Sequence, residues 1–243
     1  HPRAREVIAR LARDADVVII NYRPGVAEKL GIDYETLRAV NPKLIYCENT
    51  AFGKRGPLAA RGGYDLIVQA LSGLMAGEAK MNGDVPTYVY PAVADYATGI
   101  LISGAISAAL YAREKTGEGQ RIDCTLLATA IDMQTSQFTW IEAFDDATFP
   151  PMIEAIRQAR LDLKSFEEQV EIHNTFRPVG AGNVYYRVYQ TADGFIAVGA
   201  LSRPLWQKVR AATGLSDPRA KPDGSFDQAP EGWETEGPKL VAQ

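Results

Sequence analysis

Histidine and cysteine are scarce in this chain of 243 residues, which contains two of each. One histidine is residue 1 and the other, His173, lies in a polar stretch, so no well-placed imidazole base serves a Ser-His-Asp or Cys-His enzyme. The cysteines, Cys47 and Cys124, are too few for a disulfide framework and lack metal-site spacing. These absences argue against triad hydrolases, disulfide-rich domains and Cys/His metal sites.

A large charge of one sign is absent as well, since the net charge is −4 and the isoelectric point is near 5.4. Without a basic footprint, we expect no nucleic-acid partner. Neither GxGxxG nor GxxxxGK(S/T) occurs, so the nucleotide-binding fingerprints are absent as well. We find no apolar stretch of the roughly 18 residues that a membrane-spanning helix requires, and expect no membrane partner. Because no signal-peptide pattern opens the sequence, we expect a cytoplasmic protein.

The two ends of the sequence suggest a longer parent chain. Residue 1 is His rather than Met and leads directly into a predicted helix, and the last residues are rich in Gly, Pro and acidic side chains. Such a tail contributes little to a hydrophobic core. We therefore expect a fragment that lacks both ends of its parent.

Helices and strands alternate over the first 57 residues. Residues 4–14 have helical spacing, whereas 15–22 and 43–50 are apolar, β-branched runs separated by two short helices. This alternation predicts an α/β fold with a parallel, Rossmann-like sheet. Because such sheets bind ligands outside the carboxyl ends of their strands, the loops at 21–25 and 50–57 are candidate binding segments.

Later segments predict a buried helix at 64–75, a helix at 96–112 with small residues on one side, and then a strand and a long helix. Residues 184–190 and 195–200 read as an antiparallel hairpin. We predict three parts: a Rossmann-like domain that is incomplete at its start (1–145), a linker with helical pieces (146–177), and the start of a smaller, incomplete α+β domain (178–243).

A lone carboxylate, Asp95, follows small and apolar residues and precedes a nearly uncharged helical run. Its commonest role would be the N-cap of a helix that begins at Tyr96 or Ala97, where backbone N–H groups and the helix dipole stabilise the charged form. The same placement suits a carboxylate that attacks an acyl group. Local spacing does not choose between these roles.

Five motifs resemble the family III CoA-transferases, also called the CaiB/BaiF family: NYRPGVAEKLGID, LIYCENTAFGKRGP, RGGYDLIVQALSGLM, VADYATG and KTGEGQRIDCTLLATA. The resemblance extends to about residue 215. It implies an enzyme whose substrates are acyl-CoA and a carboxylic acid, with no metal and no cofactor beyond CoA. It also implies that the parent protein is an interlocked homodimer.

The resemblance makes Asp95 the nucleophile, which passes through a mixed aspartyl anhydride and an aspartyl-CoA thioester. It places CoA recognition on two loops, and the implied residues are Asn21, Tyr22, Arg23, Lys29, Thr50, Ala51, Phe52 and Gly53. Tyr22 and Phe52 could instead be core aromatics, and Lys54 and Arg55 could reach phosphates or be solvated. Gly180 and Gly182 fall near a family glycine loop that closes on the acyl site.

Two alternatives stay open. The α-methylacyl-CoA racemases share this fold but have His where this chain has Tyr64, and their His–Asp pair moves a proton at the α-carbon. Tyr64 therefore favours transfer, and Asp65 is expected to cap the helix that begins there. A non-catalytic acyl-CoA-binding paralogue is the other alternative. The residues do not identify the acyl donor and acceptor, although the motifs look nearer to the succinyl-CoA or carnitine branches.

Overall fold

The computed structural model describes residues 2–78, 80–83, 85–135, 139–146, 148–176 and 184–227. Internal contacts divide the chain into two compact units, residues 1–140 and 141–243. The segment predicted as a linker, 146–177, contributes helices to the second unit. The roles assigned to the three predicted parts stay a prediction.

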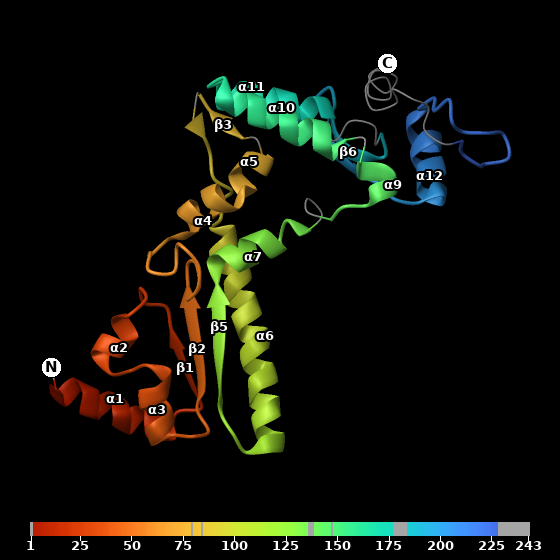
Figure 1. Cartoon of the computed structure of the whole chain (residues 1–243). Helices are drawn as coiled ribbons and strands as arrows, with labels where there is room; N and C mark the ends of the chain where they lie inside the picture. Colours follow the sequence, from red (N-terminus) through yellow and green to blue (C-terminus); the bar gives the residue numbers. More distant parts are fainter. Residues whose placement is uncertain are drawn as a thin grey trace. The chain divides into compact units, whose positions relative to one another are not determined.

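The first unit is built on a parallel sheet with the strand order β1–β2–β5 (Figure 1). These strands span Val17–Ile20, Ile45–Thr50 and Gln120–Thr125. The middle strand, β2, is almost wholly buried because it pairs on both edges and helices cover it. The parallel sheet and its helices confirm the predicted α/β fold.

Three short helices cover the β1 side of the sheet: α1 (Pro2–Asp14), α2 (Val26–Leu30) and α3 (Tyr34–Val40). Local signals fix their ends as predicted. Gly31 ends α2 with a left-handed φ of 70°, and the Asp33 side chain accepts the Thr36 N–H at 3.1 Å to cap α3. Their apolar faces enclose a core of Ala12, Ile20, Ala27, Ile32, Leu37, Leu44 and Tyr46.

The segment predicted as one buried helix at 64–75 is two helices, α4 (Asp65–Ser72) and α5 (Leu74–Glu78). Gly73 separates them with a φ of 87°, which an L side chain rarely adopts. Burial was also predicted too broadly, since Leu66, Ile67 and Leu71 are exposed. A two-stranded hairpin that the sequence did not predict follows, with β3 at Met81–Asn82 and β4 at Val85–Pro86.

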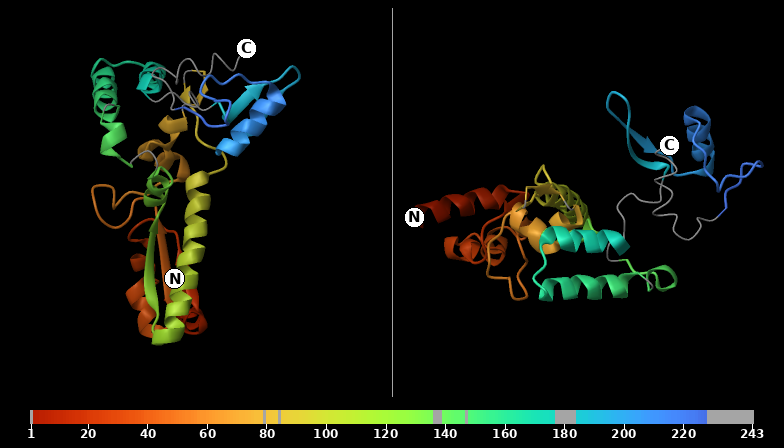
Figure 2. Two further views of the ribbon diagram at one scale, coloured as in Figure 1. Left: turned by 90° about the vertical axis from the view of Figure 1, so that its right-hand side faces the viewer. Right: turned by 90° about the horizontal axis from the view of Figure 1, so that it is seen from above.

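The long helix α6 (Val93–Thr116) lies along the sheet and packs against β2, β5, α4 and α7 (Leu126–Asp132) (Figure 2). It ends at Gly117 as predicted but begins before the predicted start. Among the described residues, α6 is the helix whose length and composition would allow it to cross a membrane. The expectation of no such segment is therefore wrong, because interspersed Gly, Ser and Thr add no charge. Core helices of globular proteins have the same length and composition, so one such helix is weak evidence for a membrane-spanning segment.

The second unit contains α9 (Glu142–Asp145), α10 (Phe149–Leu161), α11 (Phe166–Phe176), β6 (Tyr186–Gln190), β7 (Phe195–Gly199) and α12 (Arg203–Thr213). Helices α10 and α11 pack side by side (Figure 2). Strands β6 and β7 form the predicted antiparallel hairpin. Beside it, the Tyr185 and Trp206 rings stack at 5.1 Å, and Phe226 meets them edge-on.

Candidate active site

A cavity of about 210 Å³ lies at the carboxyl ends of β1 and β2 in the first unit. The loops after both strands contribute to it, together with the approach to α4 and the starts of α6 and α7. Its lining residues are Asn21, Tyr22, Arg23, Pro24, Asn49, Thr50, Ala51, Gly62, Gly63, Tyr64, Asp95 and Leu126. Ligands of parallel α/β sheets bind at this edge. The structure thus brings Asp95 to the two predicted binding loops.

Asp95 is the third residue of α6, and Ala92 occupies the N-cap position without a capping side chain. The expectation that Asp95 caps a helix beginning at Tyr96 or Ala97 is therefore wrong. The Asp95 carboxylate makes no hydrogen bond or ion pair with any residue in the described part of the chain. It is left exposed to the cavity.

The cap of α6 comes from another helix. Asp65 Oδ1 accepts the backbone N–H of Ala94 at 2.8 Å and that of Asp95 at 3.2 Å. Its other oxygen, Oδ2, accepts from Gln69 Nε2 at 2.5 Å. Asp65 is buried and is absent from the cavity lining. The predicted role of Asp65 as the cap of its own helix is wrong, because Tyr64 holds that position in α4.

The electrostatics at Asp95 run opposite to the sequence expectation. Partial burial, and then the negative charge of Asp65, raise the pKa of Asp95 above its ordinary value of 3.8. A helix start normally stabilises a carboxylate through its free N–H groups and dipole. Here two of those N–H groups already donate to Asp65, so the expected stabilisation of the charged form is outweighed.

This raised pKa predicts how activity depends on pH. The resemblance implies that Asp95 attacks an acyl group as a carboxylate, and this form is lost as the pH falls through its raised pKa. We therefore expect the acid limb of the kcat/KM profile to lie above pH 3.8, as measured by initial rates of CoA exchange. An acid limb at or below that pH would contradict the prediction, provided that circular dichroism shows the protein folded.

The first binding loop is only partly assembled around the cavity. Asn21, Tyr22 and Arg23 line it, and the half-exposed Tyr22 ring rules out a core role for that residue. Lys29 lies on the exposed face of α2, outside the cavity lining, and its backbone carbonyl accepts from Arg5 Nη2.

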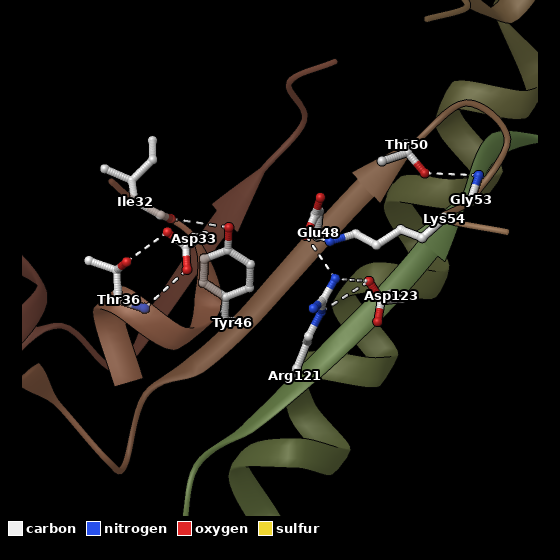
Figure 3. Close-up of polar contacts among 10 residues, drawn as sticks. All are labelled: Ile32, Asp33, Thr36, Tyr46, Glu48, Thr50, Gly53, Lys54, Arg121 and Asp123. Atoms are coloured by element: carbon white, nitrogen blue, oxygen red, sulfur yellow. Dashed lines mark hydrogen bonds and ion pairs between the residues drawn. The ribbon is translucent and has the colours of Figure 1, made fainter. Parts of the chain in front are cut away.

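The second loop contributes through its backbone shape. Thr50 and Ala51 line the cavity, and Thr50 Oγ1 accepts the Gly53 N–H at 3.0 Å, which closes the turn (Figure 3). Gly53 has a left-handed φ of 82°. Phe52 is partly buried and packs against the core formed by Ala51, Val68, Ala94, Leu126 and Ala130.

Lys54 turns away from the cavity. Its ammonium group pairs with the buried Glu48 at 2.6 Å, and Arg121 pairs with the same carboxylate at 3.1 Å (Figure 3). Arg121 also contacts Asp123 at 2.8 Å. Lys54 therefore neutralises a buried carboxylate at the end of β2, whereas Arg55 stays exposed. Gly180 and Gly182 lie outside the described residues.

Sequence reasoning did not single out Asn49, Gly62 or Gly63 as site residues. A Cβ at Gly63 would lie 2.9 Å from the Ala51 Cβ, and one at Gly62 would lie 3.0 Å from Arg23 Nε. Because both residues are glycines, the segment before α4 can pack directly against the two binding loops. The adjacent glycines of the RGGYD motif are the sequence feature that could have indicated this close packing. Asn49 Oδ1 is buried without a hydrogen-bond partner in the described part of the chain.

The lining of the cavity also bears on the racemase alternative. Asp95 is its one carboxylate among the described residues, and it contains no histidine. The described histidine, His173, belongs to α11 in the second unit. Racemisation by two opposed proton carriers needs a second acid–base group, and Asp65 is committed to backbone N–H groups.

Comparisons with known proteins agree with one another. The family model described as CoA-transferase family III matches residues 1–233. Succinate--glutarate CoA-transferase of Agrobacterium fabrum is 48% identical over 126 residues, covering 52% of this chain and 31% of that protein. Human succinyl-CoA:glutarate CoA-transferase is 34% identical over 199 residues, covering 82% and 40%.

Solved structures show the same fold. Rv3272 of Mycobacterium tuberculosis, in an orthorhombic crystal form, superposes with a TM-score of 0.70 at 26% identity, covering 100% of this chain and 57% of that one. A CaiB/BaiF family protein from Brucella suis gives a TM-score of 0.64 at 27% identity, covering 100% and 56%. The chain thus spans less than half the length of these two curated relatives and little more than half of the solved chains.

Proposed function

The chain belongs to CoA-transferase family III, and we propose that the protein moves CoA from an acyl-CoA donor to a carboxylic acid acceptor with Asp95 as the nucleophile. The observation that carries this proposal is the position of the Asp95 carboxylate. It lies in a cavity at the carboxyl edge of the sheet and has no partner among the described residues. The names of the relatives favour a dicarboxylic acid pair such as succinate and glutarate.

The proposed reaction consists of four acyl transfers. An Asp95 carboxylate oxygen attacks the thioester carbonyl of the donor, and the C–S bond breaks to give a mixed anhydride and CoA thiolate. The thiolate attacks the Asp95 acyl carbon, which releases the donor acid as a carboxylate and leaves an aspartyl-CoA thioester. The acceptor carboxylate then displaces the thiolate to form a second anhydride. The thiolate attacks the acceptor carbonyl, and Asp95 leaves as a carboxylate.

Two features of the site support this chemistry. Ionised Asp95 is poorly stabilised by its surroundings, and a carboxylate with a raised pKa is a stronger nucleophile than a fully hydrated one. The cavity is smaller than the roughly 300–1,000 Å³ typical of ligand pockets, so it suits the acyl-thioester end of CoA. CoA and acyl-CoA enter as substrates, and the proposed steps need no further cofactor.

Three N–H groups at the start of α6 already have acceptors and are not free to stabilise a developing oxyanion. The N–H groups of Ala94 and Asp95 donate to Asp65, and that of Tyr96 donates to the Ala92 carbonyl at 3.0 Å. Asn49 and the Gly62–Gly63 backbone lie at the cavity and can supply donors to a developing oxyanion.

Arg23 provides a test of CoA binding. We expect Arg23→Ala to raise KM for acyl-CoA by about 10-fold or more, because a charge-assisted hydrogen bond from its guanidinium group to the bound CoA ester contributes about 1.5–3 kcal/mol. The change in kcat should be smaller. Arg10→Ala is the matched control, since Arg10 is exposed on α1 and lies outside the cavity lining. Steady-state kinetics that show equal increases in KM for both variants would contradict this assignment.

Analysis of the products distinguishes CoA transfer from the two alternatives, a racemase and a non-catalytic paralogue. Purified protein is incubated with succinyl-CoA and glutarate in deuterated water, and the CoA esters are identified by mass spectrometry. Glutaryl-CoA without deuterium at the α-carbon supports transfer. Deuterium incorporation without acyl exchange would indicate a racemase, and binding with neither reaction would indicate a non-catalytic paralogue.

A further inference from the structure

A continuous chain of buried hydrogen bonds joins α4 to the start of α6. Asp65 connects to Ala94 and Asp95 as described above, and Gln69 holds its other oxygen. Gln69 is fully buried and also makes two bonds to the Val89 backbone, donating to the carbonyl at 3.0 Å and accepting from the N–H at 2.8 Å. A buried polar network whose members are all paired favours one arrangement of the elements it joins.

A cap is needed at this helix start, but the means used here is unusual. The first N–H groups of any helix lack intrahelical partners, and Ala92 supplies none. A Ser, Asp or Asn at position 92 would satisfy them locally. Instead a buried carboxylate is used, at a desolvation cost, and no cation pairs with Asp65 in the described part of the chain. What this arrangement adds is a direct link between α4 and the residue that carries the nucleophile.

We propose that Asp65 is a positioning residue for Asp95. Held by Gln69, its carboxylate fixes the first turn of α6 so that the Asp95 side chain projects into the cavity. By taking up the N–H groups of that turn, it also leaves the Asp95 carboxylate unpaired. This inference rests on the proposed function, because it assigns Asp65 a role only if Asp95 is the nucleophile.

The charge of Asp65 has a second effect on the same reaction. The negative charge of Asp65 disfavours the charged form of Asp95 and so raises its pKa. A carboxylate with a higher pKa is more reactive toward an acyl carbon. Tyr22, Arg23 and Tyr64 are the other titratable or charged side chains at the cavity. On β2, on the loop after it and on β5, the charged side chains Glu48, Lys54, Arg121 and Asp123 pair with one another. On α7, the charged side chain is the exposed Asp132.

Two substitutions separate positioning from charge. Asp65→Asn keeps an oxygen that accepts from Ala94 and Asp95 but removes the negative charge, and its amide nitrogen then faces Gln69 Nε2, so that one hydrogen bond is lost. We expect the acid limb of its kcat/KM profile to move to lower pH, with KM for acyl-CoA unchanged within about twofold. Asp65→Ala removes the acceptor as well, and we expect kcat to fall by about 10²-fold, the effect of misplacing a reacting group.

The readouts distinguish this role from a merely structural one. Folded fraction is measured by circular dichroism and kcat is expressed per folded molecule. An Asp65→Ala variant with wild-type kcat per folded molecule would overturn the inference, as would an unshifted pH profile in Asp65→Asn or losses in both variants that match the loss of folded protein. Asp65→Asn keeps the test open if Asp65→Ala does not fold.

A parallel Asp95→Asn variant tells the two proposals apart. If Asp95→Asn retains wild-type exchange, the proposed function fails and Asp65 has no nucleophile to position. If Asp95→Asn is inactive while Asp65→Ala keeps the wild-type kcat per folded molecule, only the positioning role fails. Inactive Asp95→Asn together with a lowered kcat per folded molecule in Asp65→Ala supports both.

Discussion

Replacing Asp95 by asparagine is expected to lower the rate of CoA transfer by on the order of 10³-fold or more, since removing a covalent nucleophile abolishes the catalysed route. The amide is nearly isosteric with the carboxylate and cannot form the anhydride or the aspartyl thioester. The Asp95 carboxylate makes no hydrogen bond or ion pair with another described residue, so the substitution should leave the fold unaffected. Because its ionisation is disfavoured in the folded protein, the variant should be at least as stable at neutral pH.

The sign of that stability effect follows from the raised pKa. A carboxyl whose pKa is higher in the folded state favours folding while it is protonated, and this contribution disappears as the pH rises through the folded value. Removing the charge should therefore not destabilise the protein at pH 7.

Asp132→Asn is the matched control for this experiment. Asp132 ends α7 in the same unit, is exposed and lies outside the cavity lining. Its exchange rate should equal that of the wild type. Near-normal exchange in Asp95→Asn would exclude Asp95 as the nucleophile.

The second large effect concerns stability. Gly119→Ala is expected to lower the free energy of unfolding by about 2–3 kcal/mol, the upper part of the range for overpacking. An added Cβ would lie 2.3 Å from the Leu44 carbonyl oxygen and 2.5 Å from the Lys43 carbonyl carbon. Both are backbone atoms, so the strand connection itself must move. Gly119 immediately precedes β5, and its N–H donates to the Pro42 carbonyl at 2.9 Å.

Gly104→Ala is the contrasting substitution. Gly104 lies inside α6, and an added Cβ would meet no described atom within 4 Å. Alanine in a helix interior is more favourable than glycine by about 0.5–1 kcal/mol, so this variant should be slightly more stable. Urea unfolding of both variants measures the difference. If Gly119→Ala is as stable as Gly104→Ala, the close approach at Gly119 is not a real constraint.

The helix ends, strands and hairpin that were predicted correctly depend on interactions between residues close together in the sequence. The Asp33 cap lies three residues from its partner Thr36, and Gly31 ends its helix by its own backbone preference. The apolar runs at 15–22 and 43–50 predicted two strands of a parallel sheet, and β1 and β2 confirm them. The antiparallel hairpin of β6 and β7 was likewise evident from its turn. Each of these signals is contained within a few neighbouring residues.

The interactions that sequence reasoning missed join residues far apart in the chain. Asp65 was expected to cap its own helix, yet its oxygen accepts from Ala94 and Asp95 about 30 residues away. Local propensity cannot distinguish these roles, because both place an acidic residue at a helix start. The same limit applies to Phe52 and Tyr22, since only tertiary packing decides which aromatic is buried.

Trapping the covalent intermediate tests the central claim most directly. The protein is incubated with succinyl-CoA, quenched with hydroxylamine and digested, and the peptide that contains Asp95 is analysed by mass spectrometry. An aspartyl thioester or anhydride reacts with hydroxylamine to give a hydroxamate, so we predict this modification on Asp95 in the wild type and its absence in Asp95→Asn. A hydroxamate on another residue, or unmodified Asp95 in a protein that exchanges CoA, would contradict the account.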